Sequence, residues 1–407
     1  MNILQPLKSL KEKLFARLYL AQTISLIGDA CTWIGIALLA FEFGKEESAK
    51  ILATALTLRV TAFIIFGSYA GVLADRYNRK TILVITNIAR MVIVFTLIFI
   101  NAIWQLYALI FLLNIFNAFF TPAYKACIPQ LIKNKDNYGD AITLSNATWQ
   151  LLGILGPGLA GGLAVWFGSR QIFLFDAVSF IISTIFVLMI PMPYLAKNET
   201  SNDSSFRNIW KDMIKGTKLL FNNLPIRFAL LIELVAAIAG AQILVNTVGH
   251  IKGDLNLTDK EYGWAMTAFG IGATIAAFTA NTFDKSKNKK ILLIIGALML
   301  SLAVAFANFV SFEVLLVFWI IAGLGQSYTE MPSQILIAQN IELDQQGKVY
   351  GSHFAWSHLW WAIGYPIAGI TGSYFQGNDF FIGGLITVVF FVTFYIWTNF
   401  KQQKYSS

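Results

Sequence analysis

The chain has 407 residues, of which 57% are hydrophobic and only 13% are charged. Soluble domains carry about 25% charged residues, so this composition excludes an ordinary soluble protein and predicts one that lies in a membrane. The two cysteines, Cys31 and Cys127, fall in apolar segments, which argues against a disulfide framework and a zinc site.

Apolar segments long enough to cross a bilayer follow one another along the whole chain. A spanning helix needs about 20 mostly apolar residues and satisfies its own backbone hydrogen bonds in lipid. Twelve such spans are predicted, at residues 17–42, 49–74, 81–100, 104–127, 140–168, 170–190, 224–248, 260–283, 291–309, 311–337, 349–375 and 379–400. The sequence therefore predicts an all-α membrane protein.

Lysine and arginine gather at alternate span ends, which predicts the orientation of the chain. Both termini and the loop after the second span are basic, so we expect them in the cytoplasm. The net charge of +8 follows from this bias. Because the bases are spread over separate segments, a nucleic-acid footprint is not expected. The basic N-terminus runs straight into a long helix, so no cleavable signal peptide is expected.

The longest polar stretch covers residues 191–223 and separates six spans from six spans. We interpret it as a cytoplasmic linker between an N-terminal bundle, residues 1–190, and a C-terminal bundle, residues 224–407. The second half of the linker, "IWKDMIKGTKLL", has helical spacing and is predicted to lie along the membrane surface.

The two halves of the chain resemble each other in sequence. One shift aligns Gly139 with Gly347 and Thr121 with Thr329, and a nearly equal shift aligns "DRYNRKTILVI" with "DKSKNKKILLII". Internal repeats are typical of transporter folds. Chance recurrence of Gly-rich helices and basic loops is the alternative, and the agreement of the two shifts favours duplication.

The stretch "GVLADRYNRKTIL", residues 71–83, lies between the second and third spans. It resembles the loop motif of the major facilitator superfamily, and the degraded copy lies between the eighth and ninth spans, as in that family. The resemblance implies two pseudo-symmetric six-helix bundles that work by alternating access. It also implies a conformational latch, whose residues here are Gly71, Asp75, Arg76, Arg79 and Asp284.

The fifth span contains "GILGPGLAGGLAVWFG", residues 153–168. Gly156, Pro157 and Gly161 resemble the Gly-Pro motif that antiporters of the superfamily carry there, although Ala160 stands where glycine is common. The glycines would allow close helix approach and the proline would remove one helix hydrogen bond. Ordinary small-residue packing is the alternative interpretation.

Ionisable groups within apolar spans are costly and are therefore candidates for function. Asp29 shares a helix face with Gln22 and Ser25, and burial would favour its neutral, protonated form. The other candidates for substrate or proton binding are Arg59, Asn114, Asn117, Glu233, Glu330 and His358. A structural hydrogen bond is the alternative role for Asp29, and Asp176 is expected to be structural.

Segments 25–41, 122–132 and 173–186 resemble the drug and siderophore exporter branch of the superfamily, which includes macrolide and enterobactin exporters. The resemblance implies proton-coupled export of a small amphipathic molecule. A lysophospholipid or lipid flippase and a metal exporter remain alternatives, and an intramembrane enzyme or a receptor is disfavoured. We expect a monomer in the bacterial inner membrane, with a small-molecule substrate and protons as ligands, no cofactor and no enzymatic activity.

Overall fold

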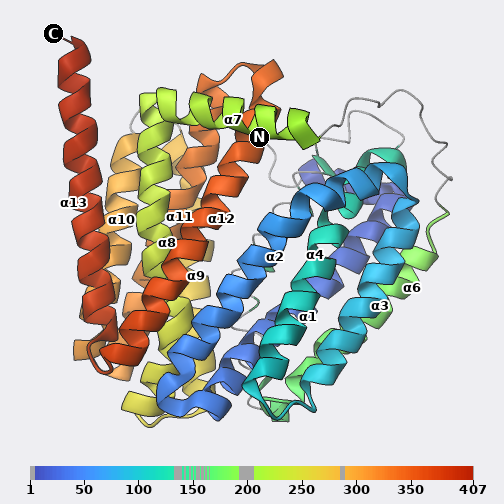
Figure 1. Cartoon of the computed structure of the whole chain (residues 1–407), viewed down its shortest axis with the longest axis horizontal. Coiled ribbons are helices and arrows are strands. Elements are labelled where there is room, and N and C mark those ends of the chain that lie inside the picture. The colour runs from blue at the N-terminus through green and yellow to red at the C-terminus, as the bar shows by residue number, and fades with distance from the viewer. Residues whose placement is uncertain are drawn as a thin grey trace. The chain divides into compact units, whose positions relative to one another are not determined.

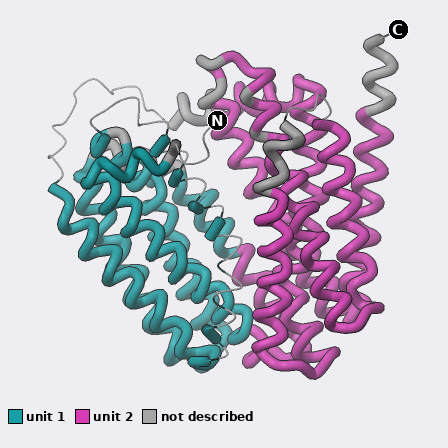
Figure 2. Tube along the Cα trace, turned by 180° about the vertical axis from the view of Figure 1, so that it is seen from behind, with its two compact units in different colours: residues 1–39, 58–201 teal, residues 40–57, 202–407 magenta. Residues whose placement is uncertain are grey.

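The computed structural model describes residues 5–132, 140–141, 144–145, 148–149, 151–152, 156, 160, 163–164, 166–191, 206–284 and 289–406. Every regular element among these residues is a helix. The helices form two compact units, the first made of residues 1–39 and 58–201 and the second of residues 40–57 and 202–407 (Figure 2). The division falls at three places along the chain: between residues 39 and 40, between 57 and 58, and between 201 and 202, the last within the predicted linker.

Unit 1 contains α3 (Arg79–Leu97), α4 (Ile103–Leu131), α6 (Ile172–Leu188) and most of α1 (Lys13–Gly44) and α2 (Ser48–Arg76). The end of α1 and the start of α2, residues 40–57, belong to unit 2. α3 packs against both α4 and α6 (Figure 1). It begins after Asn78, whose extended backbone and side-chain oxygen cap the amide of Lys80. Phe15, Leu83 and Phe120 are buried in one apolar cluster of this unit.

Unit 2 contains α7 (Phe206–Asn222), α8 (Leu224–Gly249), the π-helical turn η3 (His250–Asp254), α9 (Asp259–Asp284), α10 (Lys289–Phe306), α11 (Phe312–Asn340), α12 (Leu343–Tyr374) and α13 (Asp379–Ser406). α8 is the central helix, because it packs against α10, α11, α12 and α13. Its sequence is apolar on all sides, as expected of a buried helix, and 89% of its most apolar window is buried.

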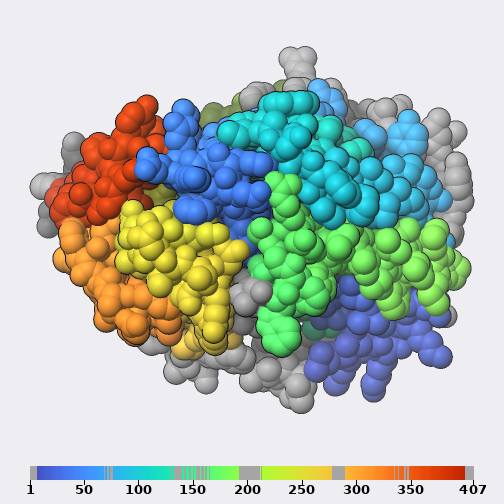
Figure 3. All heavy atoms as spheres, turned by 90° about the horizontal axis from the view of Figure 1, so that it is seen from below, coloured from blue at the N-terminus to red at the C-terminus, as the bar shows by residue number. Residues whose placement is uncertain are grey.

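Close packing around α8 depends on small residues. At Gly364 of α12, a β-carbon would lie 2.7 Å from the carbonyl oxygen of Ala237 in α8. Pro366 follows within the same helix, where neighbouring helices compensate for the missing backbone donor. At the end of the unit shown in Figure 3, the start of α13 contacts the connection between α10 and α11, where Asn308 donates a 2.8 Å hydrogen bond to Asp379.

The linker helix was predicted correctly: α7 covers its second half. Figure 1 shows α7 lying across the ends of the other helices of its unit, and it packs mainly against α12. That it lies along the membrane surface stays a prediction.

The predicted spans coincide with helices wherever the structure describes them. Eleven of the twelve match α1 to α4, α6 and α8 to α13, whereas the fifth, residues 140–168, lies largely outside the described residues. Within the described part, seven helical segments are long and apolar enough to cross a membrane by themselves. α6 has 17 residues, and α9 and α12 carry more polar side chains, so these helices depend more on their neighbours.

Candidate functional site

Unit 1 holds a buried polar network centred on Arg90 of α3, which is 2% exposed. Its Nη1 donates a 2.8 Å hydrogen bond to Oδ1 of Asn117 in α4, and its Nη2 donates to Oδ1 of Asn87. The guanidinium carbon lies 4.1 Å from the ring centroid of Phe120 and 4.4 Å from that of Phe180. The cation is therefore held between two aromatic faces and two amides.

Two carboxyl groups interact electrostatically with this cation. Asp176 of α6 is fully buried and accepts hydrogen bonds from Thr32 Oγ1 of α1 and, at 3.0 Å, from Ser179 Oγ. Asp29 of α1, which is partly exposed, interacts electrostatically with Arg90 and Arg59. Asp29 thus lies within reach of two guanidinium groups.

The remaining candidates of unit 1 lie around this network. Arg59 of α2 stacks on Trp33, with its guanidinium carbon 4.3 Å from the ring centroid. Asn117 donates a 3.5 Å hydrogen bond to Asn114, which in turn donates to the carbonyl of Ile110. The structure therefore brings Asp29, Asn114 and Asn117 to one network, with Arg59 beside Asp29.

Arg90 and Asp176 are the members that the sequence-based site omitted. Both are charged residues in apolar helices, which is the signal that could have found them. A single sequence does not reveal that they meet, because α3 and α6 are separated by more than 70 residues.

Unit 2 holds a second cluster, formed by α8, α11 and α12. Nε2 of His353 lies 2.8 Å from Oε1 of Glu233, and both residues are at most 7% exposed. Glu330 of α11 accepts a 2.6 Å hydrogen bond from Nε2 of Gln326 and interacts electrostatically with Glu233 and His353. The two predicted acids are therefore brought together around an imidazole.

This cluster has more acceptors than donors. Oε2 of Glu233 and Oε1 of Gln326 are both buried and have no hydrogen-bond partner among the described residues. Gly240 makes room for the Gln326 amide, since a β-carbon there would lie 2.8 Å from both Gln326 Oε1 and the Trp361 ring. The carboxylate oxygen can accept a proton or a ligand N–H, and the amide oxygen can accept a ligand N–H.

The predicted histidine, His358, is not part of the cluster. Its Nδ1 donates a 2.8 Å hydrogen bond to the carbonyl of Phe354 in its own helix, and its ring lies 3.9 Å from the Phe354 ring. The residue that joins Glu233 is His353, five positions earlier on the same helix. Both histidines lie in one tryptophan-rich stretch, and only the packing of α12 on α8 distinguishes them.

The loop motif contributes local contacts within unit 1. Nη1 of Arg79 donates a 2.7 Å hydrogen bond to the carbonyl of Ala126 in α4. The side chains of Gly71, Asp75, Arg76 and Asp284 lie outside the described part of the chain. The latch therefore stays a prediction.

The Gly-Pro motif is described at one position. A β-carbon at Gly156 would lie 2.5 Å from the β-carbon of Ala30 in α1, so the chain approaches α1 closely there, as the glycine predicted. Pro157 and Gly161 lie outside the described residues.

No group of three or more histidine, cysteine, aspartate or glutamate side chains in the described part of the chain is arranged to hold a metal ion.

Comparison with known proteins extends over the whole chain. The family model of the Major Facilitator Superfamily matches residues 18–246 and 230–407. The MFS-type transporter YfiS of Bacillus subtilis is 26% identical over 345 residues, which are 82% of this chain and 80% of YfiS. Macrolide efflux protein A of Streptococcus pyogenes is 27% identical over 223 residues, 54% of this chain and 53% of that protein.

The fold also matches solved structures. A bacterial homologue of the human lysosomal transporter Spinster superposes with a TM-score of 0.74 at 13% identity, covering 96% of this chain and 97% of that one. The nucleoside transporter NupG gives a TM-score of 0.72 at 14% identity, covering 95% and 98%. At these identities the likeness concerns the fold alone.

Proposed function

Because the chain belongs to the major facilitator superfamily, we propose that it is a proton-coupled transporter that exports a small amphipathic molecule, a drug or a siderophore, by alternating access. It works as a monomer in the bacterial inner membrane. Both termini lie in the cytoplasm, as the distribution of basic residues predicts. Relatives with an efflux name support the direction, since Macrolide efflux protein A matches about half of the chain.

The observation that carries the proton coupling is the buried pair of Glu233 and His353. Ionisable groups at membrane depth are costly and are retained where they bind substrates or relay protons. Histidine changes its charge near neutral pH, and a carboxylate 2.8 Å away responds to that change. The pair therefore offers an imidazole and a carboxyl group in direct contact as the site of proton binding.

Glu330 extends this pair into a relay. Its interaction with both Glu233 and His353 means that a proton on one group changes the free energy of protonating the others. Because Oε2 of Glu233 has no donor among the described residues, a substrate N–H or O–H that reaches it competes with the proton for the same oxygen. Such competition is the simplest way to exchange protons for substrate.

In unit 1, Asp29 is the second group that could exchange a proton. It interacts electrostatically with two guanidinium groups, those of Arg90 and Arg59. We assign Asp29 to substrate or proton binding together with Asn114 and Asn117. Gly71, Asp75, Arg76, Arg79 and Asp284 serve as the latch between conformations.

The test compares the two histidines of α12. Cells without their own exporters would express the wild type, His353→Gln or His358→Gln and be loaded with erythromycin, the dye Hoechst 33342 or a catecholate siderophore. The wild type and His358→Gln should lower accumulation of at least one compound, and a protonophore should abolish that protection. His353→Gln should lose the part of this protection that the protonophore abolishes in the wild type.

Equal activity of His353→Gln and the wild type would remove the pair from the mechanism. Insensitivity of the wild type to the protonophore would refute proton coupling itself. Membrane levels of each variant, measured by immunoblot, separate loss of transport from loss of protein.

A further inference from the structure

Helix α7 has one face docked on unit 2. Oγ of Ser352 in α12 donates a 3.0 Å hydrogen bond to the carbonyl of Met213, and Nε1 of Trp356 donates a 3.2 Å bond to Oγ1 of Thr217. Leu220 is fully buried, and the buried Gly216 lies directly on the backbone of α12, where a β-carbon would collide with it. These contacts make α7 an integral part of the unit rather than a loose linker.

The opposite face of α7 carries a basic stripe, formed by Lys211, Lys215 and Lys218. Their spacing of four and three residues places them on one side of the helix, and all three are exposed. Ile214, 45% exposed, lies next to them. None of the three lysines has an ion-pair partner among the described residues, and the sequence of α7 contains a single acid, Asp212.

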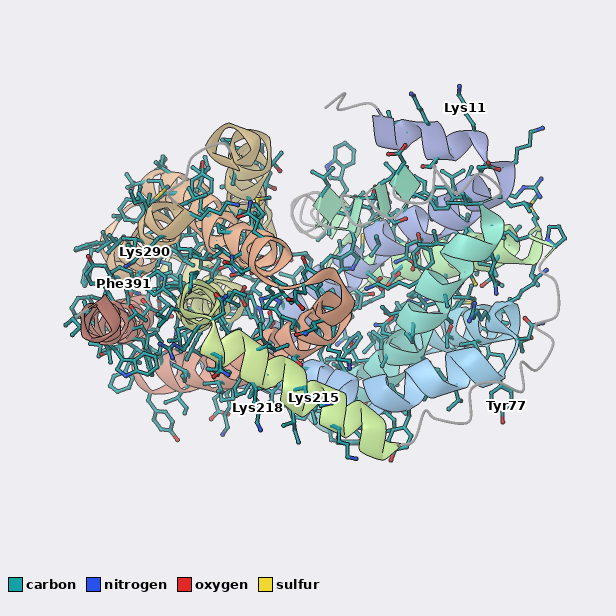
Figure 4. All side chains as sticks on the ribbon, turned by 90° about the horizontal axis from the view of Figure 1, so that it is seen from above. Lys11, Tyr77, Lys215, Lys218, Lys290 and Phe391 are labelled. Atoms are coloured by element: carbon teal, nitrogen blue, oxygen red, sulfur yellow. The ribbon has the colours of Figure 1, made fainter. Side chains whose placement is uncertain are left out.

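The position of the stripe fits the headgroup layer of a membrane. Figure 4 shows α7 along the rim of its unit, with Lys215 and Lys218 on the outer side. A helix that lies across the ends of spanning helices is at the level of the lipid phosphates. Long lysine side chains reach from such a position to phosphate, with the apolar Ile214 toward the acyl boundary.

We propose that the basic stripe is a binding site for anionic phospholipid headgroups of the cytoplasmic leaflet. Charge complementarity identifies the occupant, since three lysines with no ion-pair partner among the described residues lie beside an apolar residue and face the anionic surface at this depth. Lipid binding by α7 is independent of the proposed transport chemistry.

Bound lipid also influences the buried cluster. Ser352, which fixes α7 to α12, immediately precedes His353, the partner of Glu233. A headgroup that immobilises α7 therefore restrains the turn of α12 that carries the imidazole. This second step rests on the proposed function, whereas the binding site does not.

The first experiment measures binding through stability. The purified full-length chain in dodecyl maltoside would be titrated with dioleoylphosphatidylglycerol or dioleoylphosphatidylcholine, and its unfolding temperature recorded. A ligand that binds the folded state raises that temperature. Phosphatidylglycerol should raise it by several degrees more than phosphatidylcholine, and about 0.5 M salt should remove most of the difference because exposed charges are screened.

The matched variants remove three lysines from either unit. Lys211→Gln/Lys215→Gln/Lys218→Gln should lose the preference for phosphatidylglycerol. Lys8→Gln/Lys11→Gln/Lys13→Gln, a triple of exposed residues in unit 1, should keep it. Equal loss in both triples would indicate a general charge effect and overturn the site, as would a preference unchanged in the α7 triple.

A second measurement locates α7 directly. A nitroxide on Ile214→Cys, in a Cys31→Ala/Cys127→Ala background, would be examined in vesicles of phosphatidylglycerol and phosphatidylcholine. The nitroxide should collide more often with oxygen, which concentrates in the bilayer, than with a water-soluble nickel chelate. The ratio of oxygen collisions to chelate collisions should fall in vesicles of pure phosphatidylcholine. A label equally open to the chelate in both vesicles would place this face in water and refute the proposal. If lipid binds but transport is indifferent to it, only the link to α12 fails.

Discussion

The polar networks of the two units are built in opposite ways. In unit 1 a single buried cation, Arg90, lies between two rings and donates to two amides, and the buried acid Asp176 accepts from two hydroxyls. In unit 2 the acids Glu233 and Glu330 surround one imidazole, and oxygen atoms without donors remain. In the first arrangement the open group on the charged residue is a donor, Nε of Arg90, which has no partner among the described residues, whereas in the second the open groups are acceptors.

This difference indicates a division of labour. A buried charge that is paired and hydrogen bonded costs a great deal to disturb, so it specifies structure. A cluster with open acceptors can gain a proton or a ligand without losing existing bonds. We therefore expect substitutions in unit 1 to affect folding first and substitutions in unit 2 to affect transport first.

The largest effect is expected from Arg90→Met. It removes the donor to Asn117 and Asn87 and so leaves buried acceptors without a partner, which costs about 1–3 kcal/mol for each group. The unfolding temperature in detergent and the yield of folded protein should both fall sharply. Adding Asp176→Asn should restore part of the loss, while Arg59→Met, at a partly exposed site, should cost much less. An unchanged unfolding temperature in Arg90→Met would contradict the structural role of the network.

The next effect separates folding from transport. Glu233→Gln keeps the size of the side chain and removes its charge, so the unfolding temperature should stay within a few degrees of the wild type. Proton-driven export should nevertheless fall by roughly 10-fold or more, since general acid–base groups contribute on that scale or above. The measurement is export into everted vesicles with an imposed pH gradient. Glu233→Gln/Glu330→Gln should lose little more than Glu233→Gln alone, because the two groups act together.

The positions of the helices could be predicted from sequence, but the pairing of their side chains could not. Hydropathy located every described span, and helical spacing located α7, because both depend on residues close in the chain. Asp29, Glu233 and Glu330 stood out since charge is rare in apolar runs. The choice between His353 and His358 depends on which side of α12 meets α8, and that contact joins residues 120 positions apart. A single sequence does not show which residues far apart in the chain pack against each other.

A smaller effect is expected from the contact of Gly156 with α1. Gly156→Ala would place a β-carbon 2.5 Å from that of Ala30, so the helices must separate slightly. Overpacking of this kind costs about 1–3 kcal/mol. Gly351→Ala is the matched control, because no atom lies within 4 Å of its β-carbon position, and alanine should stabilise that helix by up to about 1 kcal/mol. The unfolding temperature should fall in Gly156→Ala and should not fall in Gly351→Ala. The reverse order would rule out close packing at Gly156.

The smallest effects concern two neighbouring bases of the loop motif. Nζ of Lys80 donates to the carbonyls of Leu188 and Ile190 at the end of α6, at 2.7 and 2.8 Å, and Arg79 donates to α4. Such bonds at helix ends are worth about 0.5–1.5 kcal/mol, so Lys80→Gln and Arg79→Gln should lower the unfolding temperature by similar small amounts. Their transport rates should differ. If Arg79 also serves as the latch, Arg79→Gln slows export while Lys80→Gln does not. Equal export by the two variants would reduce the motif to a local support of unit 1, and the exchange of conformations would then depend on other contacts.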